Sequence, residues 1–87
     1  MKKQFYYFDK NGIEDWYYLC FDEDKNEFYI EYEWSHIGIY TTIYNREDNP
    51  SGSKRLSVNE FMNNTYYARI QGAQREFKNL LSKIFNL

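Results

Sequence analysis

The chain has 87 residues and a formal net charge of −2; 43% of its residues are hydrophobic and 28% are charged. This composition is globular, and the length predicts a single domain, 1–87, which excludes a multidomain enzyme. No apolar run approaches the roughly 18 residues of a membrane span, and the apolar run at the start is too short for a signal peptide. The lone Cys cannot form an internal disulfide, so we expect a cytoplasmic protein.

The first predicted element is a β-hairpin. Residues 4–8 are rich in β-formers, and the chain returns over 15–21 with a second aromatic run. Between them lies Asn11-Gly12, a strong hairpin signal, because a tight turn needs positive φ at both central positions.

The next segments extend this hairpin into a meander. Residues 22–26 are polar and predict a turn, and residues 27–34 alternate apolar and polar side chains with the period of a half-buried strand. A fourth strand is predicted over 37–44, and a polar loop over 45–56. Short connections between four strands favour antiparallel neighbours, so residues 1–44 are predicted to form a four-stranded antiparallel β-meander.

The remaining residues, 57–87, are predicted to be helical. Ser57 and Glu60 have the spacing of a capping box, in which each side chain accepts a hydrogen bond from the other residue's backbone N–H. Leu56 and Phe61 are spaced as the matching hydrophobic staple.

A second helix is predicted from Thr65 to Phe85, after a break at Asn63-Asn64. Its apolar residues recur at spacings of three and four, which gives one hydrophobic stripe. The stripe consists of Ile70, Ala73, Phe77, Leu80, Leu81 and Ile84. Gly72 lowers helix propensity but would permit close packing on the sheet. The predicted fold class is therefore α+β, with a short helix and a long C-terminal helix packed on one face of the meander.

The predicted register divides the strand side chains between two faces. The face predicted to pack on the helices carries Tyr6, Phe8, Tyr17, Leu19, Phe21, Phe28, Ile30, Tyr32 and Trp34. The opposite face carries Phe5, Tyr7, Trp16, Tyr18, Cys20, Tyr29, Glu31 and Glu33. A slip of one residue in the second hairpin would place Trp16, Tyr18 and Cys20 under the helix instead.

Charge is also divided along the chain. Residues 1–50 hold 5 Lys/Arg and 11 Asp/Glu, whereas residues 51–87 hold 6 Lys/Arg and 2 Asp/Glu. An acidic sheet face with Tyr and Trp is typical of a surface that binds a basic protein. The predicted partner-binding residues are Tyr7, Trp16, Tyr18 and Tyr29 as apolar anchors, with Glu31 and Glu33 supplying charge complementarity. The alternative is a solvated surface, since Tyr is a good strand former on any half-exposed face.

Catalytic and cofactor patterns are weak. The four glycines are far apart and form no phosphate-binding loop. Cys20 and His36 lie on different predicted faces, which argues against a nucleophile and its base. Glu31 and Glu33 are likewise separated from His36, which argues against a metal site. We therefore expect no enzyme activity, no catalytic residue, no cofactor and no metal.

Two other functions remain open. The first is a homodimer that buries the aromatic sheet face between two copies, although this would bring Glu31 and Glu33 of both copies together. The second is nucleic-acid binding through the basic C-terminal part, with Tyr66 and Tyr67 stacking on bases. Its cations are Lys54, Arg55, Arg69, Arg75, Lys78 and Lys83.

Three short segments carry a resemblance. Residues 31–36 end a strand in Glu-Trp, residues 51–53 read Ser-Gly-Ser, and residues 56–61 start a helix with Glu-Phe. This pattern resembles small uncharacterised bacterial proteins and implies no activity. In size and charge the chain is similar to bacterial immunity proteins and to phage anti-CRISPR inhibitors. That similarity implies a small inhibitor whose partner is a toxin or a nucleic-acid-processing effector.

Overall fold

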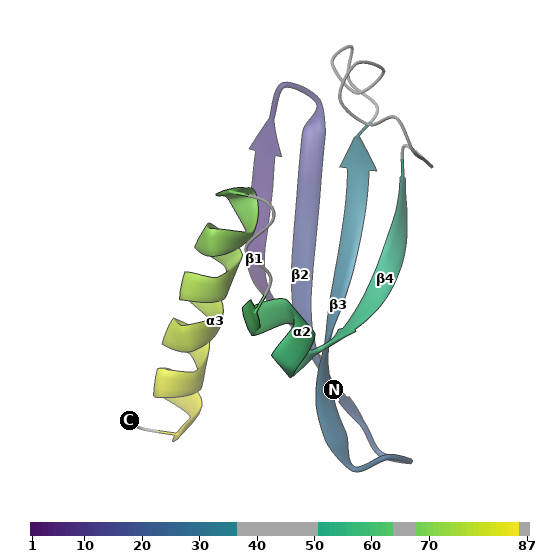
Figure 1. Ribbon diagram of the computed structural model, residues 1–87, viewed down its shortest axis with the longest axis vertical. Helices are drawn as coiled ribbons and strands as arrows, with labels where there is room; N and C mark the ends of the chain where they lie inside the picture. Colours follow the sequence, from purple (N-terminus) through teal and green to yellow (C-terminus); the bar gives the residue numbers. More distant parts are fainter. Residues whose placement is uncertain (37–50, 64–67, 86–87) are drawn as a thin grey trace.

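The computed structural model describes residues 1–36, 51–63 and 68–85, which form one antiparallel sheet and two helices (Figure 1). The sheet order is β1-β2-β3-β4. The strands are β1 (Lys2–Lys10), β2 (Ile13–Asp22), β3 (Glu27–His36) and β4 (Ser51–Ser57), and the helices are α2 (Val58–Asn63) and α3 (Ala68–Phe85). The predicted α+β class is confirmed. Neither of these helices is long and apolar enough to span a membrane.

The first hairpin has the predicted turn and register. Asn11 and Gly12 have φ values of 54° and 80°, as a tight turn between twisted strands requires. Tyr6 pairs with Tyr17, and β1 and β2 remain paired up to Lys10 and Ile13. The Asn-Gly dipeptide therefore sets which β2 side chains share a face with those of β1.

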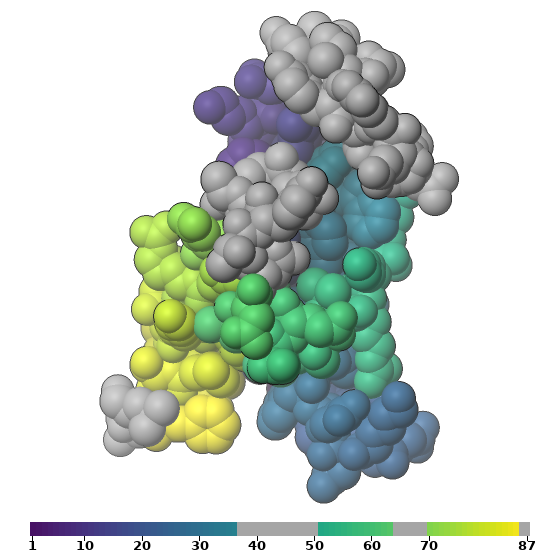
Figure 2. Space-filling view, in the orientation of Figure 1, coloured from purple at the N-terminus to yellow at the C-terminus, as the bar shows by residue number. Residues whose placement is uncertain are grey.

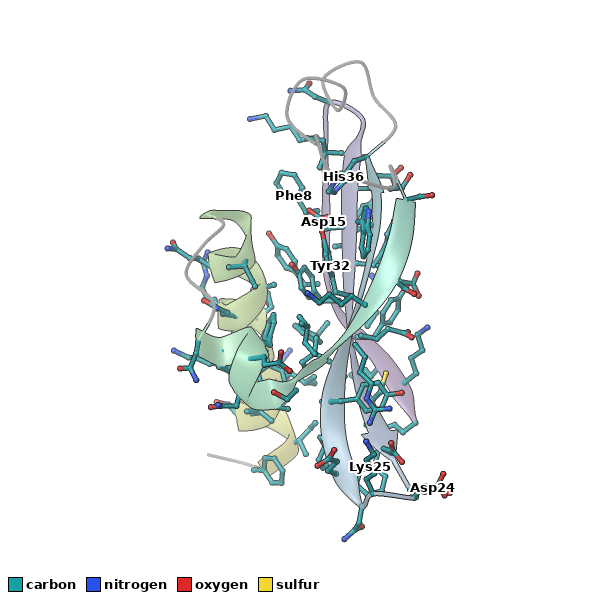
Figure 3. All side chains as sticks on the ribbon, turned by 45° about the vertical axis from the view of Figure 1, so that its right-hand side comes forward. Phe8, Asp15, Asp24, Lys25, Tyr32 and His36 are labelled. Carbon is teal, nitrogen blue, oxygen red and sulfur yellow. The ribbon has the colours of Figure 1, made fainter. Side chains whose placement is uncertain are left out.

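The second hairpin is held by the side chain of Asp22. Its Oδ1 accepts hydrogen bonds from the backbone N–H groups of Asp24 and Lys25, at 3.0 and 3.1 Å. Figure 3 shows Asp24 and Lys25 at the far end of this hairpin. Asp22 pairs with Glu27 and Leu19 pairs with Ile30, so the four-residue turn gives the predicted register rather than the slipped one.

The fourth strand differs from the prediction. β4 covers Ser51–Ser57, most of which was predicted to be loop, while the predicted strand over 37–44 lies outside the described residues. The segment SGSKRLS has few β-formers, but it pairs with β3 over its whole length, from Ser51 opposite Ser35 to Ser57 opposite Tyr29. Strand formation depends strongly on such pairing, and small polar and charged residues are common on an edge strand.

Phe5 is also placed differently from the prediction. The pairing of β1 with β2 shifts between Gln4 and Tyr6, so Phe5 is the extra residue of a β-bulge. Its ring therefore faces the helices, with centroids 5.8 Å from Phe61 and 5.4 Å from Phe77. The prediction was wrong because a bulge breaks the strict alternation of side chains.

The start of α2 is the predicted capping box. The Ser57 N–H donates to Glu60 Oε1 and the Glu60 N–H donates to Ser57 Oγ, both at 3.0 Å. The bond from the Ser57 backbone holds the pKa of the Glu60 carboxyl below its usual range. Of the predicted staple residues, Phe61 is a buried member of the hydrophobic core and Leu56 is partly buried against it.

The core lies between the sheet and both helices, with α3 against β1 and α2 against β3 and β4. Its buried members are Tyr17, Leu19, Ile30, Phe61, Ile70, Ala73, Phe77 and Leu80. Gly72 permits the predicted close approach, because a Cβ there would lie 2.6 Å from Tyr6 Oη. Ile84 differs from the predicted stripe, since it is 51% exposed near the end of α3.

Candidate functional site

The six predicted binding residues share one face of the sheet. Trp16 pairs with Tyr7 on one side and Glu33 on the other, and Tyr18 pairs with Glu31. Tyr29 lies on the same face, two residues before Glu31. Figure 3 shows α2 and α3 on the other side of the sheet, and no helix of the described part covers this one. We call this surface the open face; its described residues include Tyr7, Trp16, Tyr18, Cys20 and Tyr29, the carboxylates Asp9, Glu14, Asp22, Glu27, Glu31 and Glu33, and the cations Lys2 and Arg55.

Tyr7 and Trp16 form an aromatic pair at one end of the open face. Their ring centroids are 5.6 Å apart, and Tyr7 is 43% exposed. Tyr7 Oη donates a 2.7 Å hydrogen bond to Glu14 Oε2, which raises the pKa of Tyr7 to about 12. The hydroxyl therefore stays protonated near neutral pH and is already bonded, so the exposed Tyr7 ring and the half-buried Trp16 ring are what this end offers to a partner.

The open face is strongly acidic. Among the described residues of β1 to β4, strand alternation places six carboxylates on it against two cations, which gives these residues a formal charge of −4. The carboxylates belong to Asp9, Glu14, Asp22, Glu27, Glu31 and Glu33, and the cations belong to Lys2 and Arg55. The acidic aromatic surface predicted from the sequence is therefore assembled on one face.

The two predicted binding carboxylates are paired within the chain, which sequence reasoning missed. Lys2 Nζ lies 2.6 Å from Glu31 Oε2 and 3.3 Å from Glu33 Oε1. The hydrogen bond to Glu31 is the main cause that holds the pKa of Lys2 above its usual range. The sequence carried no signal for this contact, because strict alternation places Lys2 on the helix side with Tyr6. Only the bulge at Phe5 brings Lys2 opposite Cys20 and so onto the open face.

Arg55 lies on β4, at the opposite edge of the open face from Lys2. Its Nη2 donates a 2.7 Å hydrogen bond to Asp22 Oδ2, and its guanidinium carbon lies 3.7 Å from the centroid of the Tyr29 ring. The Arg55 bond, followed by the Lys25 backbone N–H, holds the pKa of Asp22 below its usual range. Arg55 thereby ties β4 to the β2–β3 hairpin.

We expect Arg55→Gln to raise the pKa of the Asp22 carboxyl, because the largest cause of its depression is removed. A carboxyl with a depressed folded-state pKa stabilises the fold above its unfolded-state pKa, and this contribution is lost as the pH falls through the folded-state value. The stability difference between wild type and variant should therefore shrink in acid. Carboxyl carbon NMR titration measures the pKa, and Lys54→Gln is the control, because Lys54 pairs with Tyr32 and lies on the helix side. An unchanged Asp22 pKa in Arg55→Gln would contradict the assignment.

Cys20 and His36 lie on opposite faces, as predicted. Cys20 is 3% exposed, and burial raises the pKa of its thiol, which disfavours the nucleophilic thiolate. Glu31 and Glu33 are likewise separated from His36 by the sheet. Within residues 1–36, 51–63 and 68–85, no three His, Cys, Asp or Glu side chains are placed to hold a metal ion.

The structure brings together a polar cluster that the sequence analysis did not identify. Asp15, 2% exposed on the helix side, accepts a 2.6 Å hydrogen bond from Tyr32 Oη at its Oδ1. His36 Nε2 lies 2.8 Å from the same oxygen (Figure 3). The sequence signal was Asp15 itself, a carboxylate two residues before Tyr17 and therefore on the face predicted to be buried. Because a buried carboxylate needs partners, this position should have prompted a search for them.

An apolar pocket of about 170 Å³ opens between the end of α3 and the β2–β3 hairpin, where Figure 2 shows a hollow. Its described lining is apolar, from Leu19 at the base to Phe28, Ile84 and Phe85, which are 47%, 51% and 57% exposed. The volume is below the roughly 300–1,000 Å³ of small-molecule sites, so it suits a single apolar side chain.

The predicted nucleic-acid surface is divided by the fold. Arg55 is paired with Asp22 on the open face, whereas Arg75 and Lys78 are exposed on α3, against the other side of the sheet. Tyr66 and Tyr67 lie outside the described residues.

No protein-family model matches the chain, and no curated protein and no solved structure matches it either.

Proposed function

We propose that the chain is a small protein-binding module that inhibits or neutralises a larger, basic protein through the open face. The observation that carries this proposal is the gathering of four aromatic side chains and six carboxylates on one sheet face that no described helix covers. Exposed Tyr and Trp are enriched at interfaces and supply large contact area, while carboxylates speed and orient the approach of a basic surface.

The similarity in size and charge to immunity proteins and anti-CRISPR inhibitors supports a more specific form of this proposal. A toxin or another effector that processes nucleic acid carries a basic surface, because it must bind phosphates. An acidic face is complementary to such a surface and would block it by occupying it. The site assigned to this contact is Tyr7, Trp16, Tyr18, Tyr29, Glu31 and Glu33, acting in the cytoplasm.

Partner capture with a variant of the open face tests the proposal. We expect the immobilised wild-type chain to retain one basic protein in stoichiometric amount from a lysate of its own cells. Trp16→Ala combined with Glu31→Lys should lose that protein, because the change removes an anchor and reverses one charge. Circular dichroism checks that the double variant is folded.

The matched control is Phe28→Ala combined with Glu76→Lys. It also removes one aromatic ring and reverses one charge, but Phe28 and Glu76 are exposed on the helix side of the molecule. Retention by this control and loss by the open-face variant support the proposal. Equal retention by both, in stoichiometric amount, would show that the partner binds elsewhere. If the Trp16 variant unfolds, Tyr7→Ala with Glu33→Lys provides the same test from more exposed positions.

A further inference from the structure

The ammonium group of Lys2 lies among two carboxylates and one aromatic ring on the open face. Its Nζ lies 2.6 Å from Glu31 Oε2, 3.3 Å from Glu33 Oε1 and 4.3 Å from the centroid of the Tyr18 ring. Two carboxylate oxygens and the face of an aromatic ring together attract an ammonium group through ion pairing and a cation–π contact. The open face therefore contains a formed cation site, and the chain's own Lys2 occupies it.

Arg55 shows that this arrangement occurs twice on the same surface. Its guanidinium pairs with Asp22 at 2.7 Å and lies 3.7 Å from the centroid of the Tyr29 ring. Each cation thus has one tyrosine ring and at least one carboxylate as its partners. The repetition indicates that the rings and carboxylates of the open face are arranged to hold positive side chains.

The Lys2 side chain is the solvent-facing partner of this contact, because Glu31 Oε2 itself has almost no exposed surface. The side chain of Lys2 is 49% exposed, and those of Glu31 and Glu33 are 29% and 35% exposed. Exposed ion pairs contribute little net free energy, because solvent screens them and a long side chain must be ordered. A second ammonium group, held nearby by a docked protein, can therefore replace Lys2 without disturbing the fold.

We propose that Lys2 occupies the position that a lysine side chain of the basic partner takes on docking, and that Lys2 competes with it. The inference rests on the proposed function of the open face and adds what the site recognises. Glu31 and Glu33 each present one oxygen to a compact ammonium group, whereas a guanidinium favours two parallel bonds to one carboxylate. The site therefore fits lysine better than arginine.

Competition of this kind has a measurable size. The apparent affinity for an external lysine is proportional to the fraction of molecules whose site is free of Lys2. An exposed ion pair of ordinary strength corresponds to about a two- to fivefold gain in affinity when the internal competitor is removed. Loss of one positive charge also makes the whole chain more negative, which strengthens cation binding in general, and the control must separate this effect of net charge.

The test compares Lys2→Met with Lys3→Met in the full chain. Both variants lose one lysine from adjacent positions of β1, but Lys3 pairs with Leu19, so its side chain lies on the helix side. The probe is a short, labelled oligolysine peptide at low ionic strength, and fluorescence anisotropy measures its Kd. We expect Lys2→Met to bind about two- to fivefold more tightly than wild type, and Lys3→Met to bind like wild type.

A double variant tests whether the peptide binds at the carboxylate that Lys2 leaves free. Glu31→Gln added to Lys2→Met should abolish the gain, because it removes the carboxylate closest to Nζ. Equal gains in Lys2→Met and Lys3→Met would overturn the inference and attribute the effect to net charge. So would no gain in either variant, or no binding of the peptide by any variant. These outcomes leave the proposed function to be decided by partner capture, and Lys2→Gln replaces the Met variant if that variant does not fold.

Discussion

Phe61→Ala should destabilise the protein by about 3–5 kcal/mol, the usual cost of deleting a buried aromatic side chain. Phe61 is 0% exposed, and its ring contacts Phe5, Tyr17 and Phe77 at centroid distances of 5.8, 5.5 and 5.6 Å. A chain of this length has a total stability of about 4–13 kcal/mol, so the variant should be largely unfolded at the lower end of that range. Urea denaturation followed by circular dichroism measures the loss.

Phe28→Ala is the matched control for this prediction. It removes the same side chain from the same side of the sheet, but Phe28 is 47% exposed at the rim of the apolar pocket. We expect a loss of about 1 kcal/mol or less, because little buried area is removed. If both variants lost equal stability, Phe61 would not be at the centre of the core.

The elements that the sequence predicted well have short-range causes. The Asn11-Gly12 turn and the four-residue turn after Asp22 fix the register of two hairpins, and the register assigns every side chain of β2 and β3 to a face. The Ser57–Glu60 capping box fixes the start of α2 in the same way. In each case the determining interaction spans only a few residues, so the pattern is visible in the sequence.

The elements that the sequence did not predict depend on distant partners. β4 is a strand because β3 offers it an edge, and no local pattern in SGSKRLS indicates this. Phe5 turns toward Phe61 and Phe77 because a bulge lets a third ring enter the core between β1 and the helices. The contact of Lys2 with Glu31 joins residues from two strands that are not neighbours in the sheet.

The division of the sheet into two faces explains why the open face can serve as a binding surface. Phe61, Phe77 and Ile70 cover the centre of the helix side, so the core does not depend on the rings of Tyr7 or Trp16. Those rings pack against each other and against neighbouring strand side chains, and no described helix packs against them. Variants of the open face should therefore separate binding from folding, as the capture experiment requires.

Asp15→Ala should cost about 3 kcal/mol, although it removes only a small polar side chain. The carboxylate is 2% exposed and receives both the Tyr32 hydroxyl and the His36 ring nitrogen at one oxygen, at 2.6 and 2.8 Å. Removing Asp15 takes this acceptor away from two partly buried polar groups. Such a loss costs about 3–5 kcal/mol for a buried ion pair and about 1–3 kcal/mol for a buried neutral hydrogen bond. For a domain of this size, each kcal/mol lowers Tm by roughly 4–8 °C, so thermal unfolding should show a shift above about 10 °C.

Two further variants show whether the carboxylate itself has this role. Asp24→Ala removes the same side chain from the exposed end of the β2–β3 hairpin and should change the stability by less than about 0.5 kcal/mol. Asp15→Asn keeps an oxygen that can accept the Tyr32 bond, so it should fall between Asp15→Ala and wild type. If Asp15→Ala were no more costly than Asp24→Ala, the desolvation of the buried carboxylate would offset all that its partners contribute. The expected order, with Asp24→Ala the mildest and Asp15→Ala the most severe, would instead show that this cluster fixes the end of β3 to β2.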